Sequence, residues 1–485
     1  MAIGSGEVPE PKREFRGAWI QTVYQYEYKD MSPARMREDF TRKLDNLKSY
    51  GINAILFQVR PEADAFYKSK LEPWSRFYTG VQGRAPEADF DLMQFLIAEC
   101  RKRNIEFHAW LNPYRAGAAG SREFAPSHIM RRYPERFLAY DNLIYFDPGE
   151  PQNRQFICSV VEDIVARYDV DGIHMDDYFY PYPLPGLSFP DSSSFDRYGR
   201  AAGYTNETRG NWRRANVNML IREISEAIRH TKPWVRFGIS PFGIYRNIKN
   251  TPDGSGSFTN GLQCYDDLFT DILLWARKGW IDYMMPQVYW EIGHAAADYA
   301  TLVNWWNNNS EGRHLYIGQD VSRTMKAGQL GQKMLYSRLL DNISGNCFWP
   351  ANELLWNTSG VADSLRQTYH RHPALIPAYN HKSKALPREV TNLRAETAPA
   401  GIRIYWDAYS QPGNPESSHY YVVYYFPDKG PMDRNDPSNI LEVTPEQFAI
   451  LPYARFKGNA CRIVVSAVNR FHNETKKGAI IRIEK

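Results

Sequence analysis

The sequence has few cysteines, and none of them lie in the close pairs that bind metals. The five cysteines are far apart in the 485 residues, and no CxxC spacing occurs among Cys100, Cys158, Cys264, Cys347 and Cys461. Structural zinc sites usually draw on such pairs, and a complete disulfide framework needs an even number of cysteines. We therefore expect buried free thiols, with neither a metal centre nor a disulfide scaffold.

Long hydrophobic runs and basic runs are absent as well. No stretch approaches the roughly 18 apolar residues of a membrane span, and the net charge of +4 is small for this length. Nucleic-acid-binding proteins usually carry clustered Lys and Arg. Neither a transmembrane segment nor a nucleic-acid partner is therefore expected. Residues 1–13 lack the apolar core of a signal peptide and are expected to form a flexible lead-in.

Three common catalytic motifs are also missing. The chain has no HExxH metal motif, no GxSxG nucleophile motif and no glycine-rich phosphate loop. These absences argue against zinc hydrolysis, serine hydrolysis and nucleotide chemistry. No metal or cofactor is expected.

What the chain has in quantity is aromatic residues. They make up 14% of the sequence, with 13 Trp and 32 Tyr. Such flat amphipathic side chains can stack on sugar rings, although a large core would also use them.

Short apolar runs alternate with helical patterns eight times between residues 15 and 369. In the first helical pattern, Ser32 and Pro33 form the expected start, and Phe40, Leu44 and Leu47 follow at helical spacing. Strict alternation predicts a parallel sheet covered by helices, and eight units favour a closed barrel. The expected strands are residues 15–22, 53–60, 106–114, 170–178, 235–242, 281–290, 314–321 and 345–350.

The character of the sequence changes after about residue 370. Residues 371–386 contain prolines without periodicity, and short alternating runs separated by turns follow. This pattern predicts a small antiparallel sandwich. The expected fold class is α/β, with a (β/α)₈ TIM barrel over residues 14–370, a linker over 371–386 and an all-β sandwich over 387–485. Long segments after strands two, four and five (61–90, 179–210, 243–262) predict a site at the carboxyl ends of the strands.

Strand alternation predicts which side chains point into the barrel. In the fourth strand, Ile173 and Met175 suit the helix-facing layer, so His174 and Asp176 should point inward. Applied to the other strands, the rule gives an inner set of Trp19, Gln21, Gln58, Arg60, His108, Trp110, Asn112, Gln287, Tyr289 and Glu291. Unpaired buried polar groups cost about 1–3 kcal/mol each, so this concentration favours a functional mouth over a purely structural network.

Carboxylates at this mouth suit glycosidic cleavage, which needs one ionised and one protonated carboxyl. Asp176 is the predicted ionised group, because Arg60 would favour its charge. Glu291 follows the apolar Tyr289 and Trp290 and is the predicted proton donor. Alternative catalytic or supporting groups are Asp177, His174, Asp320 and Glu62. The predicted substrate-binding residues are Trp19, Gln21, Gln58, Arg60, Trp110, Asn112, Tyr114, Tyr178, Gln287, Tyr289 and Trp290.

Six motifs in order resemble the glycosyl-hydrolase-like family ten. They are FRGAWIQT (15–22), GINAILFQVRPEADAFY (51–67), FHAWLNPYR (107–115), DGIHMDDYFYP (171–181), FGISPFGIYRN (237–247) and DYMMPQVYW (282–290). The resemblance covers residues 13–370, and residues 387–485 resemble a fibronectin type III domain. DGIHMDDY is also similar to the family-eighteen chitinase signature, with His174 and Tyr178 in place of its Asp and its catalytic Glu. We interpret that similarity as distant kinship of the barrel.

The resemblance implies a bacterial cell-envelope protein, periplasmic or surface-exposed and often a lipoprotein. One characterised relative is a divisome-localised glycosyl hydrolase, which implies cleavage of peptidoglycan glycan strands. Related barrels imply a nucleophile at the end of strand four, matching Asp176, and an acid at the end of strand six, matching Glu291. Two alternatives stay open: a hydrolase of another polysaccharide and a non-catalytic glycan-binding protein.

Overall fold

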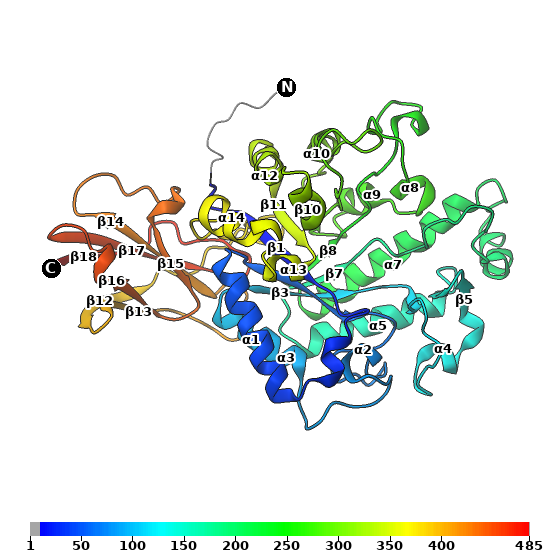
Figure 1. Cartoon of the computed structure of the whole chain (residues 1–485), viewed down its shortest axis with the longest axis horizontal. Helices are drawn as coiled ribbons and strands as arrows, with labels where there is room; N and C mark the ends of the chain where they lie inside the picture. The colour runs from blue at the N-terminus through cyan, green and yellow to red at the C-terminus, as the bar shows by residue number, and fades with distance from the viewer. Residues whose placement is uncertain (1–9, 485) are drawn as a thin grey trace.

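A closed barrel of eight parallel strands forms the centre of the protein, as a computed structural model covering residues 10–484 shows (Figure 1). Around the barrel the strand order is β1-β11-β10-β9-β8-β7-β3-β2. The strands are β1 (Phe15–Ile20), β2 (Ala54–Arg60), β3 (Glu106–Leu111), β7 (Gly172–Met175), β8 (Arg236–Ile239), β9 (Tyr283–Met284), β10 (His314–Asp320) and β11 (Ile343–Trp349). Each overlaps a predicted strand, so the predicted (β/α)₈ barrel is confirmed.

Helices pack around the outside of the barrel, between successive strands (Figure 1). The longer ones are α1 (Pro33–Ser49), α3 (Leu92–Lys102), α5 (Pro151–Arg167), α7 (Arg209–Thr231), α9 (Ile272–Arg277), α10 (Tyr299–Asn308) and α12 (Leu330–Leu339). Helix α1 begins as expected, because the Ser32 side chain accepts a hydrogen bond from the Arg35 backbone N–H and Pro33 is the first helical residue. Short helices α13 (Ala351–Leu355) and α14 (Val361–Ser364) follow β11.

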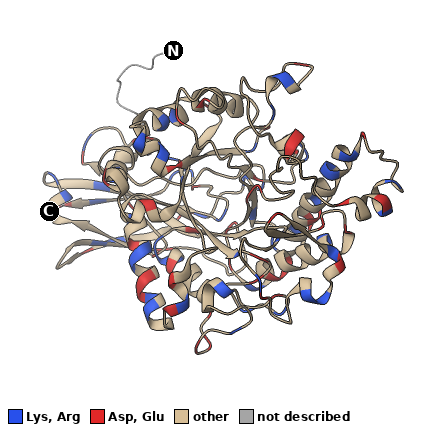
Figure 2. Cartoon of the chain, turned by 45° about the vertical axis from the view of Figure 1, so that its right-hand side comes forward, with Lys and Arg blue, Asp and Glu red and all other residues tan. Residues whose placement is uncertain are grey.

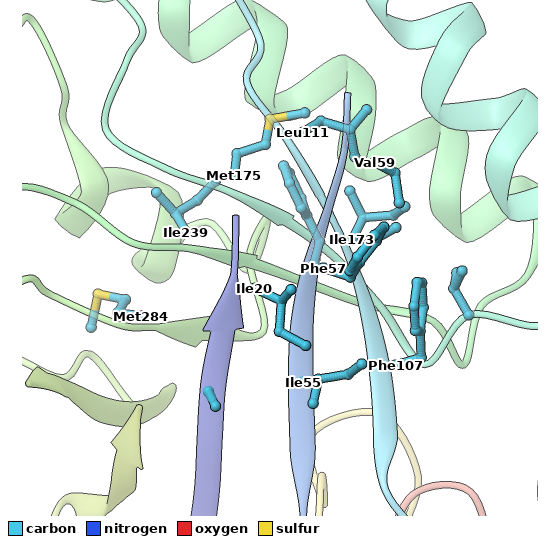
Figure 3. Close-up of a cluster of buried hydrophobic side chains, with 14 of the residues drawn as sticks. Ile20, Ile55, Phe57, Val59, Phe107, Leu111, Ile173, Met175, Ile239 and Met284 are labelled. Carbon is cyan, nitrogen blue, oxygen red and sulfur yellow. The ribbon is translucent and has the colours of Figure 1, made fainter. Parts of the chain in front are cut away.

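The helix-facing layer contains the residues that alternation assigned to it. Ile55, Phe57 and Val59 of β2 lie in one buried apolar cluster with Ile173 and Met175 of β7 (Figure 3). This layer binds the helices to the sheet through apolar burial, worth about 25 cal/mol per Å².

Aromatic rings fill the barrel axis. Phe15 stacks on Tyr316 with ring centroids 4.1 Å apart, and Tyr283 lies beside both. Gly238 leaves room for Tyr283, because a Cβ atom at position 238 would lie 2.0 Å from that ring. The lower part of the barrel is therefore a packed core.

A small sheet inserted after β3 was not predicted. It contains β4 (Arg115–Gly117), β5 (Phe137–Tyr140) and β6 (Leu143–Phe146) in the order β4-β6-β5, with short helix α4 (Ile129–Arg132) between β4 and β5. Strands of three or four residues are too short to show a clear alternation. The segment between β3 and α5 is therefore a fourth long excursion beside the three that were expected. The first two expected segments contain the short helices α2 (Arg76–Thr79) and α6 (Ser192–Ser194), and helix α8 (Cys264–Asp267) begins just after the third. Helix α11 (Val321–Lys326) follows β10.

The C-terminal region is a sandwich of two antiparallel sheets, as predicted. One sheet has the order β12-β13-β16 and the other β15-β14-β17-β18. Their bounds are β12 (Thr391–Ala398), β13 (Gly401–Asp407), β14 (Tyr420–Pro427), β15 (Ile440–Thr444), β16 (Phe448–Pro452), β17 (Ala460–Val468) and β18 (Ala479–Glu484). Ile404 and Leu451 from the first sheet share a core with Val423 and Ile463 from the second. Its likeness to a fibronectin type III domain stays a prediction.

The sandwich packs against the amino-terminal face of the barrel, where the strands begin. His472 lies 2.6 Å from Glu106 at the start of β3, and Arg470 donates to Asp169 at 2.6 Å, just before β7. The connecting segment contributes to this interface. The Leu375 backbone forms hydrogen bonds with the backbone of residues 12 and 14, and the Tyr379 ring is fully buried. Most of the predicted lead-in, residues 1–9, lies outside the described residues.

Charged residues of both signs intermix along the outer helices (Figure 2). No helix among residues 10–484 has the length and apolar character that crossing a membrane requires. All five cysteines are free thiols, four of them buried and Cys158 half-buried.

Candidate active site

A pocket of about 160 Å³ opens at the carboxyl ends of the barrel strands. Its position is the one where barrel enzymes place their active sites. The lining residues are Trp19, Trp110, Asp176, Asp177, Tyr178, Ser240, Gln287, Tyr289 and Trp349. All of these except Ser240 and Trp349 were predicted site residues.

Asp176 lies just past the end of β7 and receives hydrogen bonds from three N–H groups. Trp110 Nε1 donates to its Oδ2 at 3.0 Å, Asn112 Nδ2 donates to the same oxygen, and the Tyr178 backbone N–H lies 3.4 Å from Oδ1. An indole N–H and a backbone N–H can only donate, so these contacts favour the ionised carboxylate.

The orientation of Asn112 follows from its other contacts. Its Oδ1 accepts from Gln58 Nε2 at 2.5 Å and from Arg115 at 2.7 Å, which turns Nδ2 toward Asp176. Gln58 is oriented in turn, because its Oε1 accepts from the backbone N–H groups of Thr22 and Val23. Gln58, a predicted substrate ligand, is thus fully buried and supports Asn112 from behind.

Asp177 lines the same pocket. Alternation would have turned it outward had β7 continued, but the strand ends at Met175 and the rule no longer applies. Its Oδ1 accepts from Gln287 Nε2 at 3.0 Å, and the Tyr182 hydroxyl bonds to Oδ2. Because a hydroxyl can both donate and accept, Tyr182 can bond to Asp177 in either protonation state.

Both pocket carboxyls have raised pKa values. Burial and, to a smaller extent, the neighbouring charge of Asp177 raise the pKa of Asp176 to about 7, against the opposing effect of Arg115. Burial also raises the pKa of Asp177, opposed by its hydrogen bonds from Tyr182 and Gln287. Acid-assisted glycosidic cleavage requires one ionised and one protonated carboxyl, and a coupled pair with raised pKa values can supply both.

Arg60 does not stand beside Asp176, contrary to the prediction. A bulge between Gln58 and Arg60 places Arg60 opposite Leu111 of the helix-facing layer. Its guanidinium instead pairs with buried Glu72, with Nε 2.8 Å from Oε1. The positive charge near Asp176 is that of Arg115, which follows β3.

His174 is a hydrogen-bonding support one layer below the pocket. Burial holds its pKa well below the usual range, so the ring is neutral. Trp19 Nε1 donates to His174 Nε2 at 3.0 Å, so His174 Nδ1 carries the proton and donates to the Tyr283 hydroxyl at 3.0 Å. The chain continues from Tyr283 to His108 at 3.0 Å and from His108 to Glu106 at 2.8 Å. It links the pocket floor to the face that carries the sandwich.

Three indole rings form the apolar wall of the pocket. The Trp349 ring meets Trp19 at a centroid distance of 6.4 Å and Trp110 at 6.0 Å, both nearly perpendicular. Gly318 makes space for this wall, since a Cβ atom there would lie 3.1 Å from Trp19.

Several predicted site residues lie outside the pocket. Glu291 is half-buried beyond Trp290 and does not line it, so the structure does not pair Glu291 with Asp176. Asp320 instead caps α11 by accepting from the Arg323 backbone N–H, and Glu62 binds Arg76, Ser121 and the Ala118 backbone N–H. Both carboxylates therefore have their hydrogen-bond partners outside the pocket.

Among the predicted substrate contacts, Gln21, Tyr114 and Trp290 also do not line the pocket. Tyr114 is fully buried against Phe179, and the half-buried Trp290 packs edge-on against Phe242.

Two pocket residues were missed. Trp349 ends β11 and shares the inward parity of Cys347, so the alternation rule would have found it if applied to the eighth strand. Ser240 follows β8, and its buried hydroxyl has no hydrogen-bond partner among the described residues. Such an unpaired hydroxyl facing a pocket is available to a ligand.

Residues 10–484 contain no cluster of three or more His, Cys, Asp or Glu side chains able to hold a metal ion.

Comparison with known proteins identifies the family of this chain. The glycosyl hydrolase-like 10 family model matches residues 14–334. Glycosyl hydrolase YngK of Bacillus subtilis (strain 168) is 35% identical over 96% of this chain and 92% of its own length. Glycosyl hydrolase DigH of Escherichia coli (strain K12) is 34% identical over 64% of this chain and 73% of its own length.

Among solved structures, the glycoside hydrolase domain of PgaB (BpsB) from Bordetella bronchiseptica covers 73% of this chain and 99% of its own, with 12% identity and a TM-score of 0.48. The family match covers most of the barrel and includes both pocket carboxyls. The chain therefore belongs to the glycosyl hydrolase-like 10 family and is a glycosyl hydrolase.

Proposed function

We propose that this protein hydrolyses the glycan strands of peptidoglycan in the cell envelope, either in the periplasm or at the cell surface. The observation that carries the proposal is the pocket itself. Two buried carboxyls, both with raised pKa values, lie against three indole rings at the mouth of the barrel. Carboxyls supply the chemistry of glycosidic cleavage, and indoles supply stacking surfaces for sugar rings.

Exposed aromatic residues around the mouth favour a polymer over a small sugar. Tyr26, Phe258 and Trp356 are 55%, 79% and 69% exposed and lie in segments that follow three different barrel strands. These three could stack on sugars that extend beyond the pocket.

The test is incubation of the purified protein with intact sacculi and with glycan strands stripped of stem peptides, measuring new reducing ends. We expect cleavage of the stripped strands and a loss of at least about 100-fold in Asp176→Asn and Asp177→Asn. Asp320→Asn is the matched control, since this carboxylate caps a helix outside the pocket. Glu291→Gln tests the acid predicted from sequence, and we expect it to keep most of its activity.

Two other outcomes would point to the alternatives. Saturable binding of strands that produces no reducing ends and survives Asp176→Asn would indicate a non-catalytic glycan-binding protein. Cleavage of another glycan in a panel, with peptidoglycan left intact, would assign the same chemistry to a different polysaccharide.

A further inference from the structure

Both pocket carboxyls come from consecutive residues at the end of one strand. Neighbouring Cα atoms are about 3.8 Å apart, so a sugar in this pocket meets Asp176 and Asp177 on the same wall. Among the described residues, no other carboxylate lines the pocket. Glycosidases that use a protein nucleophile or a protein base place their two carboxyls on either side of the bond that breaks. Within residues 10–484, the lining of this pocket contains no second, opposing carboxyl.

The indole wall lies directly beside Asp176. Trp110 connects the two, because its N–H donates to Asp176 while its ring faces Trp349. The Trp19 N–H is occupied by His174, which leaves ring carbon atoms of both indoles for the pocket. An apolar corner beside a hydrogen-bond acceptor suits a group with a methyl at one end and an N–H next to it. The hydroxyls of a plain hexose would find no partner on the indole carbons.

We propose that the pocket binds the 2-acetamido group of the substrate sugar and that this group is the nucleophile of the reaction. Its methyl packs against Trp19, Trp110 and Trp349, and its N–H donates to Asp176. The inference rests on the proposed function, because peptidoglycan strands are built from 2-acetamido sugars.

In the first step the acetamido carbonyl oxygen attacks C1 of the sugar. The bond between C1 and the leaving oxygen breaks, and Asp177 transfers its proton to that oxygen. The product is a five-membered oxazolinium ring whose N–H donates to the Asp176 carboxylate. In the second step water attacks C1 and gives a proton back to Asp177, and the ring opens to restore the acetamido group. One water is consumed per bond, and two displacements at C1 retain its configuration.

The contacts of the two carboxyls support this division of roles. The hydrogen bonds to Asp176 come from N–H groups of Trp110, Asn112 and Tyr178, so Asp176 is the better placed of the two to be ionised and face an oxazolinium cation when Asp177 holds the proton of the pair. Asp177 is paired with a hydroxyl, which can adapt as the proton leaves and returns. The unpartnered hydroxyl of Ser240 remains to bond the sugar.

The first experiment compares two preparations of stripped strands with the full-length protein. One is chemically de-N-acetylated, and the other is de-N-acetylated and then re-N-acetylated as a control for chain damage. We expect re-acetylated strands to be cleaved at least about 100-fold faster, because only they carry the internal nucleophile. Proton NMR should show a retained anomeric configuration in the first product.

The second experiment measures binding of the thiazoline of N-acetylglucosamine by calorimetry. This stable molecule has sulfur in place of the attacking oxygen and resembles the cyclic intermediate. We expect it to bind at least about 100-fold more tightly than N-acetylglucosamine, as transition-state analogues do. Asp176→Asn and Trp349→Ala should weaken it, whereas Asp320→Asn should not.

These results separate the inference from the proposed function. Equal cleavage of both strand preparations, or an inverted product, would overturn the acetamido nucleophile while the hydrolase assignment stands. Thiazoline binding that depends on Asp176, without cleavage of any strand, would support the acetamido site and reject peptidoglycan as the substrate. Absence of both cleavage and thiazoline binding would overturn both.

Discussion

At the scale of single residues, the buried carboxylate of Asp176 is expected to lower the free energy of unfolding at pH values where it is ionised. Its pKa in the folded protein, about 7, lies above its ordinary value of 3.8. The folded state therefore binds the proton more tightly, and stability contributed by this group is lost as pH rises through 7. We expect Asp176→Asn to be more stable than the parent protein by roughly 1–3 kcal/mol at pH 8, with no advantage at pH 4. Urea unfolding at the two pH values measures this. A variant less stable than the parent at pH 8 would contradict the burial argument.

The same pair sets the pH dependence of catalysis. Cleavage needs one ionised and one protonated carboxyl, and the last proton leaves the pair near pH 7 because the pKa of Asp176 is raised to that value. We expect kcat/KM to fall about tenfold per pH unit on the alkaline side of pH 7. A rate profile of reducing-end release from pH 5 to 9 checks this, with Asp320→Asn as control. A rate that stays flat up to pH 9 would mean that neither carboxyl acts as the acid.

At the scale of elements, the barrel depends on glycines where strands approach the aromatic rings of the axis. In β8, a methyl group at position 238 would lie 2.0 Å from the Tyr283 ring. We expect Gly238→Ala to destabilise the protein by about 1–3 kcal/mol through overpacking. Activity should fall as well, because Tyr283 bonds to His174, which orients Trp19.

The matched control for that change is Gly210→Ala in α7. Its Cβ would be 3.4 Å from the nearest atom, an ordinary contact, and alanine favours a helix over glycine by roughly 0.5–1 kcal/mol. Thermal unfolding of both variants should move in opposite directions. Equal destabilisation of the two would show that the space around Tyr283 is not limiting.

At the scale of the whole molecule, the sandwich and the barrel share a buried ionic cluster. Arg236 at the start of β8 contacts Glu106, and its Nη1 donates to the Arg470 carbonyl of the sandwich at 3.0 Å. Removing one member of a buried pair costs about 3–5 kcal/mol, because the other charge is left without compensation. We expect Arg236→Met to destabilise the protein by about that amount in urea unfolding, whereas Arg482→Met in the exposed pair with Asp428 should change little.

Buried histidines add a second dependence of stability on pH. Burial lowers the pKa of seven of them: His108, His128, His174, His314, His370, His419 and His472. The unfolded chain binds protons at these histidines near pH 6.5, while the folded chain does not. Their contribution to stability is therefore present above pH 6.5 and lost as pH falls below it, by about 1 kcal/mol per histidine at pH 5.5.

Buried carboxyls oppose that trend. Asp64 and Asp147 have pKa values raised to about 8 and 6, so they and Asp176 favour the folded state as pH falls. The histidines are more numerous, and we expect a net loss of stability between pH 7.5 and 5.5, measured by urea unfolding. His174→Gln should reduce the size of that loss. A protein that becomes more stable at pH 5.5 would show that the carboxyls dominate.

The sequence by itself determined the barrel and the identity of most pocket residues. Eight apolar runs of strand length separated by helical patterns favour a closed parallel barrel covered by helices. Alternation along each strand then assigns its residues to the barrel axis or to the helix-facing layer. Trp19, Trp110 and Asp176 were assigned to the mouth in this way. The rule depends only on local backbone geometry, so it holds wherever a strand is regular.

Tertiary structure alone decided the partners of Asp176. A bulge in β2 turned Arg60 to Glu72, and the end of β7 at Met175 brought Asp177 into the pocket beside it. Glu291 follows strand six in the chain, but no local pattern shows where a side chain past a strand end will point. Packing between distant segments determines where a strand bulges or ends and where the inserted sheet places Arg115. Local sequence patterns carry no information about such packing.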